Sequence, residues 1–174
     1  MVETYSGGGV DVFSPDSEAI RLEDISAGLA HTCRFGGQCL NFYSVAHHSL
    51  HVSSELTGES ARIQLLGLLH DAGEASLGDI PRPLKTEVNG VEAIEARVLE
   101  AVWSVFGIDS STESEWEQVM AADDRLLSYE ATHLLQGGDC AGDALDQGYD
   151  LDSNNIEQIR DQFTARAESV LTQV

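Results

Sequence analysis

The chain has 174 residues, a length that predicts one domain spanning residues 1–174 with a core of ordinary size. Apolar residues make up 42% of the chain and charged residues 22%, proportions that exclude an intrinsically disordered protein. Thirty Asp and Glu against nine Lys and Arg give a net charge of -21, which excludes a basic groove for DNA or RNA.

The first twenty residues are predicted to form a short β-hairpin or arm. Gly7, Gly8 and Gly9 separate two short runs of strand-forming residues, and Pro15 follows the second run. We expect this hairpin to lead directly into the body of the fold.

From Leu22 onward, apolar residues recur at helical spacing, and glycines end most of the runs. The runs predict an all-α bundle of about six helices, the last of them at residues 154–174. The segment 61–73 is apolar on nearly all sides, which indicates the buried central helix. Pro81 and Pro83 predict a break in helical structure at residues 78–83.

Three cysteines, Cys33, Cys39 and Cys140, are scattered along the chain. Their odd number and spacing argue against a disulfide framework and a thiolate zinc site, and they fit a reducing compartment. The N-terminus lacks the apolar core of a signal peptide, and no stretch reaches the ~18 to 20 apolar residues of a membrane span. We therefore expect a cytoplasmic protein with no membrane partner.

The acidic residues are spread along the whole chain, and Lys85 is the single lysine. Solvated helix faces account for many acids, but a surface adapted to concentrated salt also accounts for the scarcity of lysine. At molar ionic strength the Debye length falls to ~3 Å, which screens the repulsion among these charges. The composition therefore favours a halophilic source.

The histidines and carboxylates that are candidate metal ligands lie in four short segments: residues 47–48, residues 70–71, Glu74 and residues 123–124. His70 and Asp71 end an apolar run, where a partly buried ionisable pair needs a partner or a metal ion. Adjacent residues on a helix point about 100° apart, so both side chains reach one ion beside the helix end. Imidazoles and carboxylates without thiolates suit divalent Mn, Co, Ni, Fe or Zn.

These segments resemble the H…HD…D signature of the HD-domain metal-dependent phosphohydrolases, whose domain is an all-helical bundle. The similarity extends to longer motifs: SVAHHS at 44–49, HDAGE at 70–74, GDIPRPLK at 78–85, and ADDR at 122–125 followed by Leu127 and Glu130. The element RFGG at 34–37 resembles one in the deoxynucleotidase-like branch. The resemblance covers residues 5 to 135, approximately, and the combination of motifs is specific.

The resemblance implies a single HD domain that holds one divalent metal ion through His48, His70, Asp71 and Asp123. In the family, the residue matching Glu74 orients or deprotonates the attacking water, and the residue matching Asp79 protonates the leaving oxygen. Arg34 and Lys85 would bind the phosphate, the arginine through two hydrogen bonds and the lysine as a point charge. Arg82 is a third cation within the motifs, and a homodimer is a further family expectation.

Two ligand positions are ambiguous in the sequence, because His47 adjoins His48 and Asp124 adjoins Asp123. The matching family positions are His48 and Asp123. His51, one helical turn after His48, is expected at the protein surface, with a position lining the site as the alternative.

The implied activity is removal of the 5′-phosphate of (deoxy)nucleoside monophosphates by a metal-activated water, with a small-molecule nucleotide as the partner. One alternative is a triphosphohydrolase that releases triphosphate from a dNTP. The other is a non-catalytic HD-fold module that binds a nucleotide or a partner. Glu74 argues against the module, because a binding domain does not need a carboxylate beside the metal.

Overall fold

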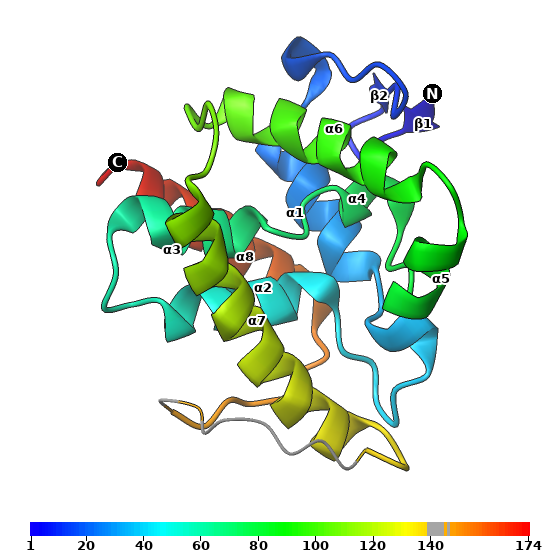
Figure 1. Ribbon diagram of the computed structural model, residues 1–174, viewed down its shortest axis with the longest axis vertical. Coiled ribbons are helices and arrows are strands. Elements are labelled where there is room, and N and C mark those ends of the chain that lie inside the picture. The colour runs from blue at the N-terminus through cyan, green and yellow to red at the C-terminus, as the bar shows by residue number, and fades with distance from the viewer. Residues whose placement is uncertain (139–144, 146) are drawn as a thin grey trace.

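The computed structural model describes residues 1–138, 145 and 147–174, which form a mostly helical fold with one small antiparallel sheet (Figure 1). Two short 3-10 turns lie at Ser17–Ala19 (η1) and Phe35–Gly37 (η2). The helices are α1 (Leu22–His31), α2 (Val45–Glu55), α3 (Ala61–Leu69), α4 (Glu74–Leu77), α5 (Arg82–Glu87), α6 (Val91–Val105), α7 (Glu113–Leu134) and α8 (Ile156–Leu171). No helix among the described residues is long and apolar enough to cross a membrane. Cys140 lies outside the described residues.

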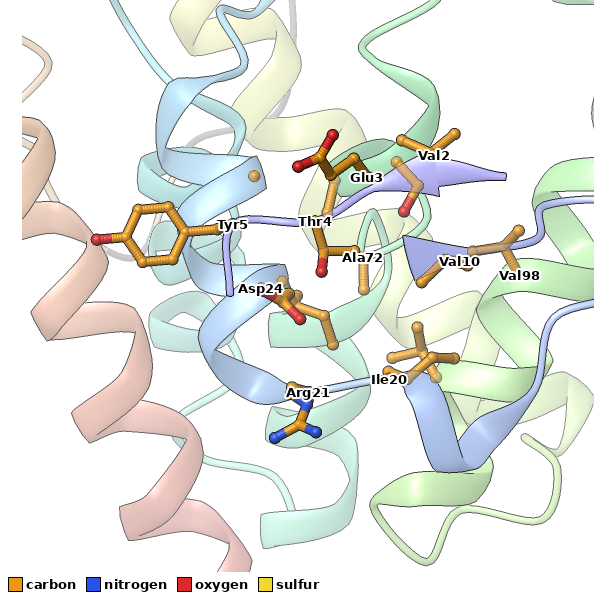
Figure 2. A pocket seen from close by; sticks show the side chains of 15 residues that line it. Val2, Glu3, Thr4, Tyr5, Val10, Ile20, Arg21, Asp24, Ala72 and Val98 are labelled. Atoms are coloured by element: carbon orange, nitrogen blue, oxygen red, sulfur yellow. The ribbon is translucent and has the colours of Figure 1, made fainter. Parts of the chain in front are cut away.

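The predicted N-terminal hairpin is present. Strand β1 (Val2–Glu3) pairs antiparallel with β2 (Gly9–Val10). The carboxylate of Asp24 in α1 accepts hydrogen bonds from the backbone N–H of Ser6 at 2.7 Å and from its hydroxyl at 3.0 Å, which fixes the hairpin on α1. A cavity of about 140 Å³ remains between the hairpin, α1, α4 and α6, and its lining mixes apolar side chains with polar ones such as Glu3, Arg21 and Asp24 (Figure 2).

Helices α2 and α3 form the centre of the fold. α2 contacts α1, α3, α7 and α8, and α3 also contacts α6, α7 and α8. α3 buries Ile63 and residues 65–69, as its apolar circumference predicts. At Gly67 the two helices come so close that a β-carbon would lie 2.5 Å from Leu56 Cδ1 and 3.3 Å from Val52 Cγ1. Glycine at this position therefore allows the contact between α2 and α3.

The structure differs from the predicted helix pattern between residues 70 and 87. α3 ends at Leu69 rather than at residue 73, and the chain turns before α4 begins at Glu74. The predicted break at 78–83 is shorter than expected, because α5 begins at Arg82. Pro83 lies in the first turn of α5, where its missing N–H removes no intrahelical hydrogen bond. Two short helices therefore follow the pair His70–Asp71.

α7 crosses the front of α2 and α3 in Figure 1, and three of its residues that bear on the candidate site below lie on one face. Its N-terminus has a capping box, in which Thr112 Oγ1 accepts from the N–H of Glu115 at 3.2 Å and Glu115 Oε2 accepts from the N–H of Thr112 at 2.8 Å. Trp116, Asp123 and Glu130 follow at intervals of seven residues. Seven residues are close to two full turns, so these side chains lie on one side of α7.

Candidate metal centre

Four side chains from three parts of the chain meet at one point: His48 of α2, His70 and Asp71 just after α3, and Asp123 of α7. His48 Nε2 lies 3.0 Å from Asp123 Oδ1, and His70 Nε2 lies 3.1 Å from Asp71 Oδ2. The two Nε2 atoms are 3.3 Å apart. Ligand atoms of His48, His70 and Asp71 all lie within 4.8 Å of one another, so these three residues could hold a metal ion.

Each of the two imidazoles is oriented by a contact between its Nδ1 atom and an oxygen. His70 Nδ1 lies 2.8 Å from the carbonyl oxygen of Gly67, and His48 Nδ1 lies 2.8 Å from Glu130 Oε1. An Nδ1–H that donates to these oxygens leaves Nε2 with the lone pair that a metal needs. Two imidazoles with two carboxylates form a donor set that suits divalent Mn, Fe, Co, Ni or Zn, so the residues fit the implied ion.

Without a bound cation, the four groups share protons among themselves. Burial lowers the pKa of His70, but Asp71 and Asp123 outweigh it and raise that pKa to about 9. Burial raises the pKa of Asp123, but His48 and His70 outweigh it and lower that pKa to about 2. The pKa of Asp71 is likewise held far below its ordinary value, against the effect of burial, chiefly by His70. The cluster therefore binds positive charge, which a divalent ion would supply in place of protons.

The structure separates the two ambiguous pairs of neighbours. His48 lies in the cluster, whereas the ring of His47 packs against that of Tyr43 with centroids 5.0 Å apart. Asp123 is 5% exposed and lies in the cluster, whereas the side chain of Asp124 is 62% exposed. The positions that match the family motif are thus the ones that converge.

The expected surface position of His51 is wrong. His51 is buried, and its Nδ1 lies 2.9 Å from the hydroxyl of Tyr43. The reason is that Tyr43 and Tyr149 cover this face of α2, with the ring of Tyr149 centred 4.5 Å from that of His51. Burial, aided by the nearby His47, lowers the pKa of His51 to about 3.

Glu130 of α7, together with Arg34 and Tyr43, forms the wall behind the cluster, which we call the rear wall. Glu130 is fully buried, and its Oε2 lies 3.0 Å from Arg34 Nη2. Its Oε1 accepts a hydrogen bond from the hydroxyl of Tyr43 at 2.8 Å and contacts His48 Nδ1 at 2.8 Å. Sequence reasoning placed Glu130 in a motif without a role. Its position seven residues after Asp123, on the same face of α7, was the available signal.

Arg34 reaches the cluster from a constrained loop. Phe35 has φ 56°, and the next two residues are glycines with φ 59° and 78°. A non-glycine residue in this left-handed region costs of order 1–3 kcal/mol, so the surrounding contacts hold the loop in place. Arg34 Nη1 lies 3.5 Å from Asp71 Oδ2, and Arg34 is buried, with 8% of its surface exposed. The loop therefore fixes a cation beside a carboxylate of the cluster.

Glu74, Asp79, Arg82 and Lys85 line the open side of the cluster, which we call the front wall. Glu74 is 6% exposed; its Oε1 lies 3.2 Å from Lys85 Nζ, and its Oε2 has no hydrogen-bond partner among the described residues. Burial raises the pKa of Glu74 to about 8, and the nearby Asp71 and Asp79 act in the same direction. Asp79 Oδ2 accepts a hydrogen bond at 3.2 Å from the backbone N–H of Gly36, which belongs to the loop that carries Arg34.

Two hollows open onto the cluster. The smaller, of about 250 Å³, is lined by the front wall and also by Arg34 and Phe35. The larger, of about 550 Å³, extends between α6 and α7. All four predicted catalytic and phosphate-binding residues lie at these hollows: Glu74, Asp79, Arg34 and Lys85.

Comparisons with known proteins show the family but no activity. No family model matches the chain. An uncharacterized protein of Rhodobacter capsulatus is 31% identical over 182 residues, which cover 95% of this chain and 93% of that protein. The uncharacterized protein YfdR of Escherichia coli is 32% identical over 108 residues, which cover 62% of this chain and 59% of YfdR. The chain belongs to the family of the Rhodobacter capsulatus protein.

Proposed function

We propose that this member of that family is a metal-dependent phosphohydrolase with an HD-type helical domain, which removes the 5′-phosphate of nucleoside monophosphates. The observation that carries the proposal is the convergence of two imidazoles and two carboxylates beside Glu74, which lines an open hollow and has one buried oxygen without a hydrogen-bond partner among the described residues. A site built only to store a metal would not need a buried carboxylate oxygen without a partner.

His48, His70, Asp71 and Asp123 would hold the divalent ion. When bound, such an ion lowers the pKa of a coordinated water and polarises the phosphoryl oxygens. The Nδ1 contacts of the two histidines keep both Nε2 atoms directed at the ion position.

Glu74 is proposed to take the proton of the attacking water. Its Oε2 is free to accept this proton, while Lys85 holds Oε1 and so fixes the carboxylate. A bond forms between the water oxygen and phosphorus, and the bond between phosphorus and the 5′-oxygen breaks. Asp79 is proposed to deliver a proton to that departing oxygen, so that the proton lost by the water is matched by the one gained by the product. A general base with a pKa near neutrality is well matched to this transfer.

The cations of the site favour a single phosphate group. Arg34 and Lys85 would contact the phosphate oxygens, each already lying next to a carboxylate of the site. A monophosphate carries about two negative charges at neutral pH, since its second pKa is ≈ 6. One divalent ion with these two cations balances that charge, whereas a triphosphate usually requires further basic groups or metal ions.

The test is a hydrolysis screen on protein stripped with a chelator and resupplied with Mn, Co, Ni or Zn. Nucleoside monophosphates should show a higher kcat/KM than di- or triphosphates. Asp71→Ala should lose bound metal and activity together, whereas Asp124→Ala, the matched exposed carboxylate, should keep both.

Three results would contradict the proposal. Stoichiometric metal in Asp71→Ala would refute the ligand set. Release of intact triphosphate from dNTPs, with monophosphates untouched, would identify a triphosphohydrolase. Tight nucleotide binding without turnover for any metal would identify a binding module.

A further inference from the structure

The larger hollow extends well beyond the metal cluster. Its volume of about 550 Å³ is within the ordinary range of small-molecule sites. One end is formed by the cluster and the front wall, and the other by α6 and α7. The residues of this far end are Glu92, Glu95, Ala96, Leu99, Trp116 and Met120.

Trp116 gives the far end a flat aromatic face. Its side chain is half-buried, and the buried ring of Trp103 packs against it edge to face, with centroids 5.5 Å apart and planes at 64°. This contact fixes the indole and leaves part of it to the hollow. A fixed indole that is partly open to a cavity is a platform for a flat π-system.

The distance from this platform to the metal cluster suits a nucleotide. Trp116 precedes Asp123 by seven residues on the same face of α7, which corresponds to ~10 Å along the helix axis. Met120 lies between them and also lines the hollow. The separation is similar to that between the phosphate of a nucleotide and its base.

The charged groups of the far end are both carboxylates. Glu95 is paired with Lys85 Nζ at 2.9 Å, whereas Glu92 is exposed in the first turn of α6. An ionised carboxylate only accepts hydrogen bonds, so it binds N–H groups and repels carbonyl oxygens. This end of the hollow is therefore complementary to a ring that carries an amino group.

We infer that the larger hollow selects the base of the substrate: Trp116 stacks on the ring, and Glu92 accepts a hydrogen bond from an exocyclic amino group. The substrate class is then a nucleotide with an amino-bearing base, adenine above all because it has no carbonyl group. This inference rests on the proposed function for the role of the phosphate end, but it can be tested on nucleosides, which contain no phosphate.

The chain has two tryptophans, Trp103 and Trp116, and they contact each other, so intrinsic fluorescence reports directly on this site. Adenosine should quench the fluorescence on titration and bind about tenfold more tightly than purine riboside, which has the same ring system without the amino group. The titrations use the metal-loaded protein and are repeated by calorimetry, so that variants of Trp116 are measured equally well.

Two variants test the two contacts. Trp116→Ala should weaken both nucleosides about tenfold or more, and Trp116→Phe, which keeps a ring, should recover most of the affinity. Glu92→Gln should bring the ratio of adenosine to purine riboside affinity close to one. Glu100→Gln removes the same charge from an exposed position of α6 that does not line the hollow, and should leave the ratio unchanged.

The results separate this inference from the proposed function. Equal affinities for adenosine and purine riboside would overturn the base site, even if the protein releases phosphate. Nucleoside affinities that remain at the parent level in both Trp116→Phe and Trp116→Ala, with both variants folded, would overturn it as well. Selective adenosine binding without hydrolysis of any nucleotide would instead support the base site and refute the hydrolase. In an active enzyme, Trp116→Ala should raise KM for AMP while leaving KM for deoxyribose 5-phosphate, which has no base, unchanged.

Discussion

Glu130 in the rear wall and Glu74 in the front wall are both buried, at 0% and 6% exposure, yet their pKa values shift in opposite directions. Burial raises the pKa of Glu130, but His48 and Arg34 outweigh it and lower that pKa to about 2. Glu130 therefore stays ionised at neutral pH, and the other side chains of the rear wall are arranged around its charge.

The surroundings of Glu74 are opposite in sign. Burial raises its pKa to about 8, Asp71 and Asp79 add to the rise, and Lys85 only partly opposes it. Comparison with Glu130 shows that neighbouring charge, and not depth of burial, decides which buried carboxylate stays ionised. The rear wall holds its charge constant, while the front wall contains a group that can gain or lose a proton near neutral pH.

The largest effect is expected from Glu130→Ala. It removes the nearer of the two carboxylates that contact the buried guanidinium of Arg34, which should cost about 3–5 kcal/mol of unfolding free energy. It also removes the partner of His48 Nδ1, so metal affinity should fall 10–100-fold, roughly. Urea denaturation and metal analysis measure the two effects. Asp124→Ala on the same helix is the control, and a Glu130→Ala protein of native stability would remove the basis of the comparison.

Glu74→Gln should separate activity from stability. Loss of the proton acceptor should reduce kcat by about 10²–10⁴-fold. Unfolding free energy should not fall, and its gain over the parent chain should grow as pH rises from 4.5 to 8, because the parent chain loses stability over that range whereas glutamine does not titrate. Steady-state kinetics and denaturation at pH 6 and pH 9 measure both. A variant that retains full kcat would exclude Glu74 as the base.

The stability of the chelator-treated protein should depend on pH at both limits. The folded pKa of Glu130, about 2, lies below its ordinary 4.5, so its contribution to stability is lost as pH falls from about 4.5 to 2. The folded pKa of Glu74, about 8, lies above 4.5, so stability falls as pH rises between those values, where only the unfolded chain has released the proton. Urea midpoints should fall less steeply between pH 4.5 and 8 in Glu74→Gln than in the parent chain. Identical slopes of the two proteins over that range would contradict the assignment.

The smallest effect is expected from Arg82→Ala. Arg82 pairs with Asp123 at 2.8 Å and with Asp124 at 3.1 Å, but its side chain is 58% exposed. Exposed ion pairs contribute about 0–1 kcal/mol, so thermal unfolding should change little. A loss of stability as large as that of Glu130→Ala would show that the front wall is as rigid a charge network as the rear wall.

The metal cluster could be predicted from sequence because its order and spacing reside in short motifs on helices with clear apolar faces. The rear wall could not be predicted in this way, because Glu130 contacts His48 and Tyr43, which precede it by 82 and 87 positions in the chain. The sequence pattern did not predict α5, because it does not distinguish a proline that starts a helix from one that interrupts it. His51 was misplaced because a helical stripe does not reveal how many neighbours surround the helix.

The spacing of Trp116, Asp123 and Glu130 along α7 has a consequence for how this protein tolerates insertions and deletions. One residue added between Asp123 and Glu130 would leave the helix intact. The helical residues after the insertion would rotate by ~100° about the helix axis and move ~1.5 Å along it. Glu130 would then leave Arg34 and His48, while the residues before the insertion keep their places. The solvent-facing residues of α7 are free to change in identity, whereas the number of residues between its three site positions is fixed.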